Sequence, residues 1–267
     1  SDVIIGVLGG SSARNFDMEF LRNGAVSSKG INMDSGENVD VASLSLGGYQ
    51  EQLIEQLHQL GKPIITILVQ GRPYDLMKIE SLTNAIATAW FPGQEGGKAI
   101  AQMISGRNNP SGRLSLSYPI NSQQLPVYYY QRAASKQENY YDLSGSPVYP
   151  FGHGLSYTTF EYSQMEVKTD IDKVIISIKV KNTGSVSGKT STLVYVRLID
   201  GAVIQRTKLL KAFRKDKLQS QEERLLVFEL TSEDFSYMDI DDKRHYAKKA
   251  VIIIEQQERE IKCNWQE

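Results

Sequence analysis

The periodicity of apolar residues along the chain changes near residue 151, and this change limits the possible folds more than any other feature. Before it, short apolar runs at residues 3–8, 64–69 and 85–90 alternate with stretches of helical periodicity. After it, apolar and polar side chains alternate one by one, as they do over residues 174–180. The sequence therefore predicts two domains, an α/β domain followed by an all-β domain.

Helical patterns separate the apolar runs of the first half. Residues 49–60 place Leu53, Leu57 and Leu60 on one face of a helix, and Gly61 ends it. A second helix is predicted over residues 95–104 and a fourth strand over residues 113–118, where the apolar pattern returns. Apolar strands alternating with helices are typical of a mostly parallel sheet covered on both faces, a three-layer α/β sandwich.

The carboxyl ends of parallel strands are where such folds bind ligands. The loops after Leu8, Val69 and Trp90 are therefore the places where a site is expected.

The second half carries the signals of a β-sandwich. Strands are predicted over residues 174–180, 192–198, 225–230 and 250–255. Turn sequences such as Asn182-Thr183-Gly184 lie between them, which favours a sandwich of about 100 residues. A proline- and tyrosine-rich stretch precedes it, and its aromatic side chains are expected to pack on a domain surface. The predicted boundaries are 1–126 for the α/β domain, 127–154 for the connecting segment and 155–267 for the sandwich.

Composition excludes several classes of function. With a formal net charge of −1, the chain of 267 residues offers no general attraction for nucleic acid or an anionic membrane. Its one cysteine, Cys263, excludes a disulfide framework. The three histidines lack ligand spacing and no phosphate-binding glycine loop is present, so we expect neither a metal nor a cofactor.

A short loop, residues 34–40, is the one place where acid–base chemistry is plausible. It carries three carboxylates, Asp34, Glu37 and Asp40, around a glycine. They could simply be solvated surface charge or charges at a helix N-terminus. Alternatively, one of them could have a raised pKa and act as a general acid. The residues alone leave both interpretations open.

Six collinear segments resemble glycoside hydrolase family 3. They are DSGENVDVASLSLGGYQEQLI (34–54), GKPIITILVQGRP (61–73), AWFPGQEGGKAIAQMISGRNNPSGRLSLSYP (89–119), YPFGHGLSYTTFEYS (149–163) and, in the last domain, VKNTGSVSGK (180–189) with LLKAFRKDKL (209–218). Together they cover nearly the whole chain. The resemblance implies an α/β sandwich, a connecting segment packed on the domains, and a fibronectin type III-like β-sandwich, in agreement with the rhythm of the sequence.

The resemblance also implies a function. The family hydrolyses β-linked glycosides with retention, using one carboxylate as nucleophile and a second as acid/base. Glu37 matches the acid/base glutamate, whereas the nucleophile is expected on a preceding (β/α)8 barrel that this chain does not contain. The sequence departs from the family pattern at Asn38, where glycine is usual, and at Val41, where an arginine that could anchor the loop is usual.

Further expectations follow from the resemblance. The chain is expected to be the C-terminal part of a β-glucosidase-like exo-glycosidase, inactive by itself, with the missing barrel and an oligosaccharide or β-glucoside as partners. Arg14 and Phe16 are candidates for the aglycone side of the substrate cleft, although packing or surface roles are favoured for both. The alternatives are a β-xylosidase of the same family and a non-catalytic carbohydrate-binding or assembly module. By family analogy the protein is expected to be periplasmic or secreted.

Overall fold

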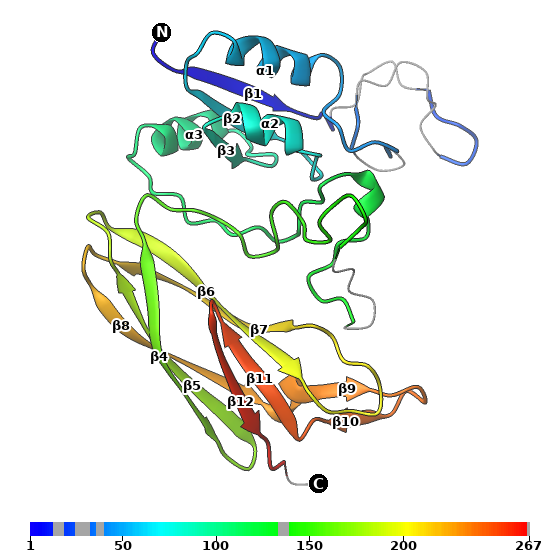
Figure 1. Ribbon diagram of the computed structural model, residues 1–267, viewed down its shortest axis with the longest axis vertical. Coiled ribbons are helices and arrows are strands. Elements are labelled where there is room, and N and C mark those ends of the chain that lie inside the picture. The colour runs from blue at the N-terminus through cyan, green and yellow to red at the C-terminus, as the bar shows by residue number, and fades with distance from the viewer. Residues whose placement is uncertain (13–18, 25–32, 36–39, 133–138, 266–267) are drawn as a thin grey trace. The chain divides into compact units, whose positions relative to one another are not determined.

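The computed structural model describes residues 1–12, 19–24, 33–35, 40–132 and 139–265. The chain forms two compact units, which are considered separately (Figure 1). One unit comprises Ser1–Ile104, Ser117–Val127 and Ser146–Tyr149, and the other comprises Ser105–Leu116, Tyr128–Gly145 and Pro150–Glu267. The predicted succession of α/β and all-β structure is confirmed. The domain boundaries at 126 and 154 stay a prediction.

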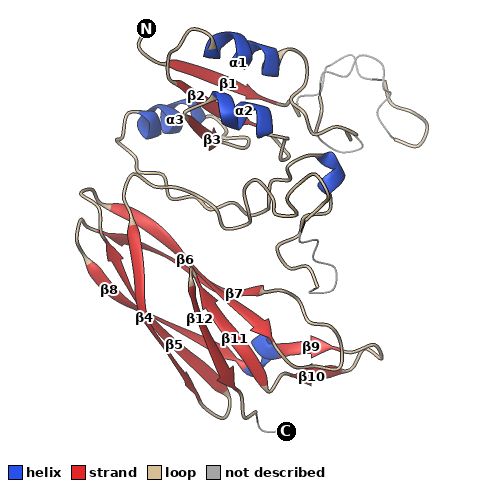
Figure 2. Ribbon diagram, in the orientation of Figure 1, coloured by secondary structure: helices blue, strands red, loops and turns tan. Residues whose placement is uncertain are grey.

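A parallel three-stranded sheet forms the centre of the first unit, in the order β1-β2-β3. Its elements are β1 (Ile4–Gly9), α1 (Gln50–His58), β2 (Ile64–Val69), α2 (Met77–Leu82), β3 (Ala85–Thr88), α3 (Gly96–Ile104) and the 3-10 helix η1 (Ser122–Gln124). Figure 2 shows these helices beside the strands. The strands predicted from the apolar runs and both predicted helices are confirmed, whereas the short α2 was not predicted.

Burial is uneven across this sheet. Ile64, Ile67 and Leu68 of β2 are fully buried, as expected for a central strand. On β1, Gly6 lies against Ile54 of α1, at a point where a Cβ atom would be only 3.2 Å from the Ile54 Cδ1 atom. The opposite face of β1 is uncovered in the described structure, because Val7 is 63 % exposed. The predicted covering of the sheet is thus seen on one face of β1 only.

The fourth strand predicted over residues 113–118 is wrong. The parallel sheet ends at β3 in the described structure, and residues 113–118 pair with none of its strands. Instead, Leu114 exchanges backbone hydrogen bonds with Gly152 and His153, and Tyr118 pairs with Tyr149 through an isolated bridge. A strand of a sheet and an extended connecting segment have the same backbone conformation, so the apolar pattern of the sequence does not distinguish them.

The second unit is a β-sandwich of two antiparallel sheets, β12-β11-β6-β7 and β4-β5-β8. Its elements are β4 (Phe160–Thr169), β5 (Lys173–Asn182), β6 (Gly188–Leu198), β7 (Leu209–Leu218), β8 (Glu223–Thr231), η3 (Ser232–Phe235), β9 (Ser236–Met238), β10 (Arg244–Tyr246), β11 (Lys249–Ile254) and β12 (Gln257–Lys262). Val174, Ile176, Ile178 and Val180 are fully buried between the sheets, as the alternation predicts. Every predicted strand of this half is confirmed.

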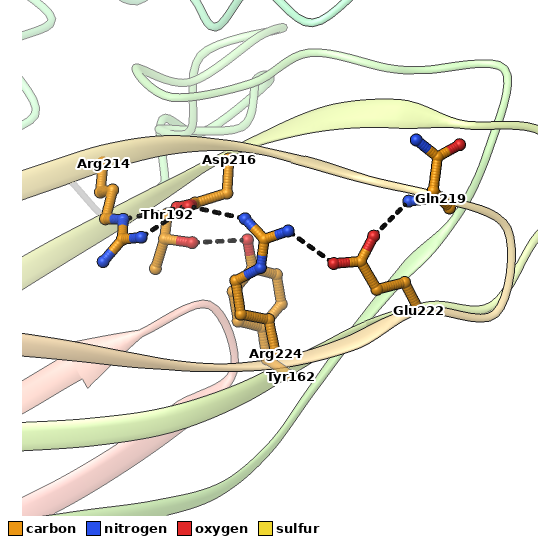
Figure 3. A network of polar contacts seen from close by, with 7 residues as sticks. All are labelled: Tyr162, Thr192, Arg214, Asp216, Gln219, Glu222 and Arg224. Atoms are coloured by element: carbon orange, nitrogen blue, oxygen red, sulfur yellow. Dashed lines mark hydrogen bonds and ion pairs between the residues drawn. The ribbon is translucent and has the colours of Figure 1, made fainter.

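A network of charged side chains ties the two sheets together at one end of the sandwich (Figure 3). Asp216 of β7 is buried and accepts hydrogen bonds from the Arg214 Nη2 atom at 2.8 Å and from the Arg224 Nη1 atom at 3.3 Å. Arg224 of β8 also donates to Glu222, whose other oxygen accepts from the Gln219 backbone N–H. Because β7 and β8 belong to different sheets, Asp216 and Arg224 link those sheets.

Part of the connecting segment packs on the sandwich itself. Tyr129 and Phe151 stack with ring centroids 4.1 Å apart, and both pack beside Tyr195 of β6. The Arg206 guanidinium lies over the Tyr130 ring. These rings are packed rather than solvated, as expected for the tyrosine-rich stretch.

Asn182 is the most completely bonded side chain at the turn that follows β5. Its Oδ1 atom accepts from the Thr158 hydroxyl at 2.6 Å and from the Gly184 N–H at 3.1 Å. Its Nδ2 atom donates to the carbonyls of Val186, at 2.9 Å, and Leu218, at 3.3 Å. The side chain is fully buried, so each of these bonds replaces one to water.

We expect Asn182→Asp to lower the free energy of unfolding by at least about 2 kcal/mol at pH 7, because an ionised carboxylate would face two carbonyl oxygens. The buried carboxyl would have a raised pKa, so this loss should grow as the pH rises from about 4, near its unfolded pKa, towards neutrality. Urea denaturation between pH 4 and pH 7 measures the effect.

Asn121→Asp provides the control, because within the described structure the Asn121 side chain accepts a hydrogen bond from the Gln123 N–H and donates none, and a carboxylate can do the same. Equal stability of the Asn182 variant and the unmodified chain at pH 7 would contradict the role given to this amide.

Candidate active site at the carboxyl end of the parallel sheet

The carboxyl ends of β1, β2 and β3 lie at one edge of the sheet, and polar side chains gather there. The register aligns Gly9 with Val69 and Leu68 with Thr88, so the segments that follow the three strands leave the sheet together. The Gln70 N–H donates to the Trp90 carbonyl at 3.1 Å, which joins the segments after β2 and β3. The sequence predicted a site at this edge.

Gln50, at the start of α1, fixes the end of β1. Its side-chain amide accepts from the Gly9 N–H at 2.7 Å and donates to the Gly9 carbonyl at 2.9 Å. Gly9 has a φ of 138°, and a Cβ atom there would overlap the Val69 carbonyl, so only glycine suits this position. Gly9 therefore allows the close packing of β1 against β2 at this edge.

Asp34 is bound on several sides. Its Oδ1 atom accepts from the Ser11 N–H at 2.9 Å, and its Oδ2 atom accepts from the Tyr74 hydroxyl. Burial, together with the hydrogen bond to Asp34 and its negative charge, raises the pKa of Tyr74 above its ordinary value. The Asp34 N–H also donates to the Ser11 carbonyl at 3.0 Å. The beginning of the three-carboxylate loop is thus held against the ends of β1 and β2.

Asp40, at the other end of the loop, pairs with Arg72. The Arg72 Nη1 atom lies 2.9 Å from the Asp40 Oδ1 atom, and the Val41 N–H donates to the same oxygen at 2.8 Å. These hydrogen bonds and the arginine charge lower the pKa of Asp40. Asp40 therefore stays ionised under weakly acidic conditions, which makes it unsuitable as a general acid.

Two features at this edge carry a conformational or desolvation cost. Trp90 has a φ of 52°, which is rare for a bulky side chain. Ser35 is buried, and its hydroxyl has no hydrogen-bond partner among the described residues. Gly71 lies beside Ser35, because a Cβ atom at Gly71 would be 2.7 Å from the Ser35 Oγ atom.

The three site residues predicted from the sequence, Glu37, Arg14 and Phe16, lie outside the described residues. Their roles stay predictions, as does the effect of Asn38, which also lies outside them. The structure does describe both ends of the loop. It also identifies Arg72 and Tyr74, for which no role was predicted, although both lie in the segment that follows β2. No three histidine, cysteine or acidic side chains cluster to bind a metal within the part of the chain that the structure describes.

Comparison with known protein families decides the affiliation. Residues 1–157 match the Glycosyl hydrolase family 3 C-terminal domain, and residues 191–255 match a Fibronectin type III-like domain. The chain belongs to glycoside hydrolase family 3. The predicted family and both predicted folds are confirmed.

Family 3 relatives are similar in sequence and structure. A β-xylosidase from Formosa agariphila is 34 % identical over 88 % of this chain and 33 % of its own length. A periplasmic β-glucosidase from Salmonella typhimurium is 36 % identical over 70 % of this chain and 26 % of its own length. The structure of a β-glucosidase from Listeria innocua in complex with isofagomine superposes with a TM-score of 0.87, at 28 % identity, over 99 % of this chain and 37 % of that one.

The ion pair between Arg72 and Asp40 is directly testable. We expect Arg72→Met to raise the Asp40 pKa towards its ordinary value of 3.8, because the variant removes the main hydrogen bond and the positive charge. A pH titration of the Asp40 carboxyl carbon by NMR measures this pKa.

Lys78→Met removes a different surface cation, which pairs with Glu51 at 3.0 Å, and should leave Asp40 unaffected. An unchanged Asp40 titration in the Arg72 variant would show that the pair does not form in solution.

Proposed function

We propose that this chain is the C-terminal part of a longer retaining β-glycosidase, of the β-glucosidase type, and that Glu37 is its general acid/base. The nucleophile is a carboxylate on a preceding (β/α)8 barrel. The chain spans about a third of its β-xylosidase relative and about a quarter of its β-glucosidase relative, which supports a large preceding part.

The observation that carries this proposal is the placement of the three-carboxylate loop. Its described ends, Asp34 and Asp40, are both bonded to segments that leave the carboxyl edge of the parallel sheet. Ligands of α/β folds bind at this edge. The hydrogen bonds engage both of these carboxylates, which makes Asp34 and Asp40 poorer candidates for acid–base chemistry.

The reaction follows from two carboxyl groups about 5 Å apart on either side of the glycosidic bond. The nucleophile attacks the anomeric carbon while Glu37 gives its proton to the leaving oxygen. The ionised Glu37 then removes a proton from water, which attacks the glycosyl–enzyme bond and releases the sugar with its configuration retained. Without the barrel the chain has no nucleophile, so the 267 residues by themselves are inactive.

A β-linked glucoside is the proposed substrate class, because the Salmonella and Listeria relatives are named β-glucosidases. β-Xylosidase activity is the second candidate, because the Formosa relative, which matches 88 % of this chain, is named a β-xylosidase. Comparing kcat/KM for p-nitrophenyl β-glucoside and p-nitrophenyl β-xyloside decides between them.

The proposed setting of the enzyme is the periplasm or the exterior of the cell. The name of the Salmonella relative supports this location. Within the described residues, no helix is both long and apolar enough to span a membrane.

In the longer enzyme, we expect Glu37→Ala to lower kcat by roughly 10²- to 10⁴-fold for glycosides with poor leaving groups, because protonation of the leaving oxygen is lost. Azide should restore part of the turnover of 2,4-dinitrophenyl glycosides by attacking the glycosyl–enzyme and giving a β-glycosyl azide. Steady-state kinetics and product analysis by NMR measure both effects.

Glu51→Gln is a matched control, because Glu51 pairs with Lys78 on the helices and should be dispensable for activity. Unchanged hydrolysis of a poor-leaving-group glycoside by the Glu37 variant would exclude Glu37 as acid/base. A natural protein without an upstream barrel would instead favour a non-catalytic carbohydrate-binding module.

A further inference from the structure

Residues 206–217, which include most of β7, concentrate positive charge in the sandwich. They contain six lysines and arginines and a single acidic residue, Asp216, which gives this stretch a net charge of +5 (six minus one). Because the formal net charge of the whole chain is −1, all other residues together carry −6 (−1 minus +5). A local excess of this size attracts anions at short range, although the molecule as a whole is nearly neutral.

Half of these cations are engaged within the protein. Two lie over aromatic rings and one binds a carboxylate: Arg206 over Tyr130, Lys208 over Tyr195, and Arg214 beside Asp216. The other three, Lys211, Lys215 and Lys217, form no ion pair with any residue that the structure describes. Their charges are therefore available to a partner.

An exposed aromatic ring lies in line with two of the unpaired lysines. Phe213, Lys215 and Lys217 occupy alternate positions of β7, so their side chains leave the same face of the sheet, and Phe213 is 73 % exposed. Alternate residues of a strand are about 7 Å apart, so the ring and the two lysines form a row about 14 Å long. Strand β7 is also the last strand of its sheet, which leaves one side of the row open (Figure 1).

The neighbouring strand adds a fourth cation at the end of this row. Lys189 of β6 is directly opposite Lys217, and both side chains are exposed. Like charges in directly opposed positions destabilise a pair of strands, so the fold itself gains nothing from this arrangement. Lysines on an edge strand can prevent other strands from pairing with it, but that role explains neither the exposed Phe213 ring nor a lysine on the inner strand β6.

We propose that Phe213, Lys215, Lys217 and Lys189, here called the basic strip, bind an acidic polysaccharide that carries carboxylate or sulfate groups. The ammonium groups pair with the acidic groups of the polymer, and the Phe213 ring packs against the C–H groups on the face of a sugar. A membrane surface fits less well, because the strip has only one apolar side chain to insert. The choice of a polysaccharide among polyanions rests on the proposed glycosidase function.

Affinity electrophoresis of the 267-residue chain tests the proposal, with dextran sulfate, polygalacturonate or uncharged dextran in the gel. We expect both acidic polymers to retard the chain and dextran to have no effect. Replacing Lys215 and Lys217 together by glutamine should raise the Kd for the acidic polymers roughly 10-fold, because two ion pairs are lost. Phe213→Ala should raise it roughly 3- to 10-fold, because the ring contact is lost. Added salt should weaken binding of the unmodified chain.

The opposite sheet of the same sandwich offers matched controls. Replacing Lys173 and Lys179 of β5 by glutamine makes the same change in charge, but these lysines already pair with Glu229 and Glu223. Leu225→Ala on β8 removes an apolar side chain of similar exposure, 56 %. Both control variants should keep the Kd of the unmodified chain. Thermal unfolding identifies any strip variant that does not fold, and the folded ones among the Phe213, Lys189→Gln and Lys215/Lys217 variants decide.

Three results would overturn the inference: equal retardation by dextran and dextran sulfate, an unchanged Kd in the folded strip variants, or binding to phosphatidylglycerol vesicles without binding to either acidic polysaccharide. Aggregation of the strip variants with an unchanged Kd would assign the lysines to protection of the strand edge instead. Hydrolysis of p-nitrophenyl β-glucoside by the longer enzyme tests the proposed function separately, because this small uncharged substrate does not require the basic strip.

Discussion

The parallel pairing of β1, β2 and β3 is the constraint on which the candidate site depends. Parallel strands all end at the same edge, so the segments that follow β1, β2 and β3 leave the sheet together. Ser11 and Tyr74 lie on two of these segments, and their hydrogen bonds hold Asp34 at the same edge. Glycines at the strand ends then let the segments approach closely, as at Gly10, where a Cβ atom would overlap the Tyr74 hydroxyl and the Asp34 carboxylate.

Much of the fold could be predicted because apolar residues have a characteristic spacing in each half of the sequence. In the sandwich, the alternation around Ile176 and Ile178 correctly identified the buried face of β5. Strand β7 gave a weaker signal, because Phe213 on it is 73 % exposed and its neighbours are mostly lysine and arginine. Helix α2 is only six residues long, too short to show a helical period. Whether so short a helix forms depends on tertiary packing, which the sequence alone does not show.

The candidate site could be predicted only in part. Topology placed it at the carboxyl edge of the sheet, and the resemblance singled out Glu37. The partners of the loop could not be predicted, because Arg72 and Asp40 are 32 positions apart and nothing in their local sequence pairs them. The departure at Val41 suggested a missing anchor, yet an arginine from the next strand's loop bonds to Asp40. A hydrogen bond of this kind depends on the three-dimensional approach of two segments.

Strained or unsatisfied groups occur in both units, so such groups do not by themselves locate a site. In the sandwich, the Asp216 Oδ1 atom binds two arginines, but its Oδ2 atom is buried with no hydrogen-bond partner among the described residues. Four non-glycine residues with a positive φ also lie in the second unit among the residues that the structure describes. In the α/β unit, the Ser35 hydroxyl is likewise buried without a described partner, and Trp90 has a positive φ. These two groups differ from the others in their place, because they lie at the carboxyl edge of the parallel sheet, where α/β folds bind ligands. Topology, more than local strain, therefore supports this edge as the candidate site.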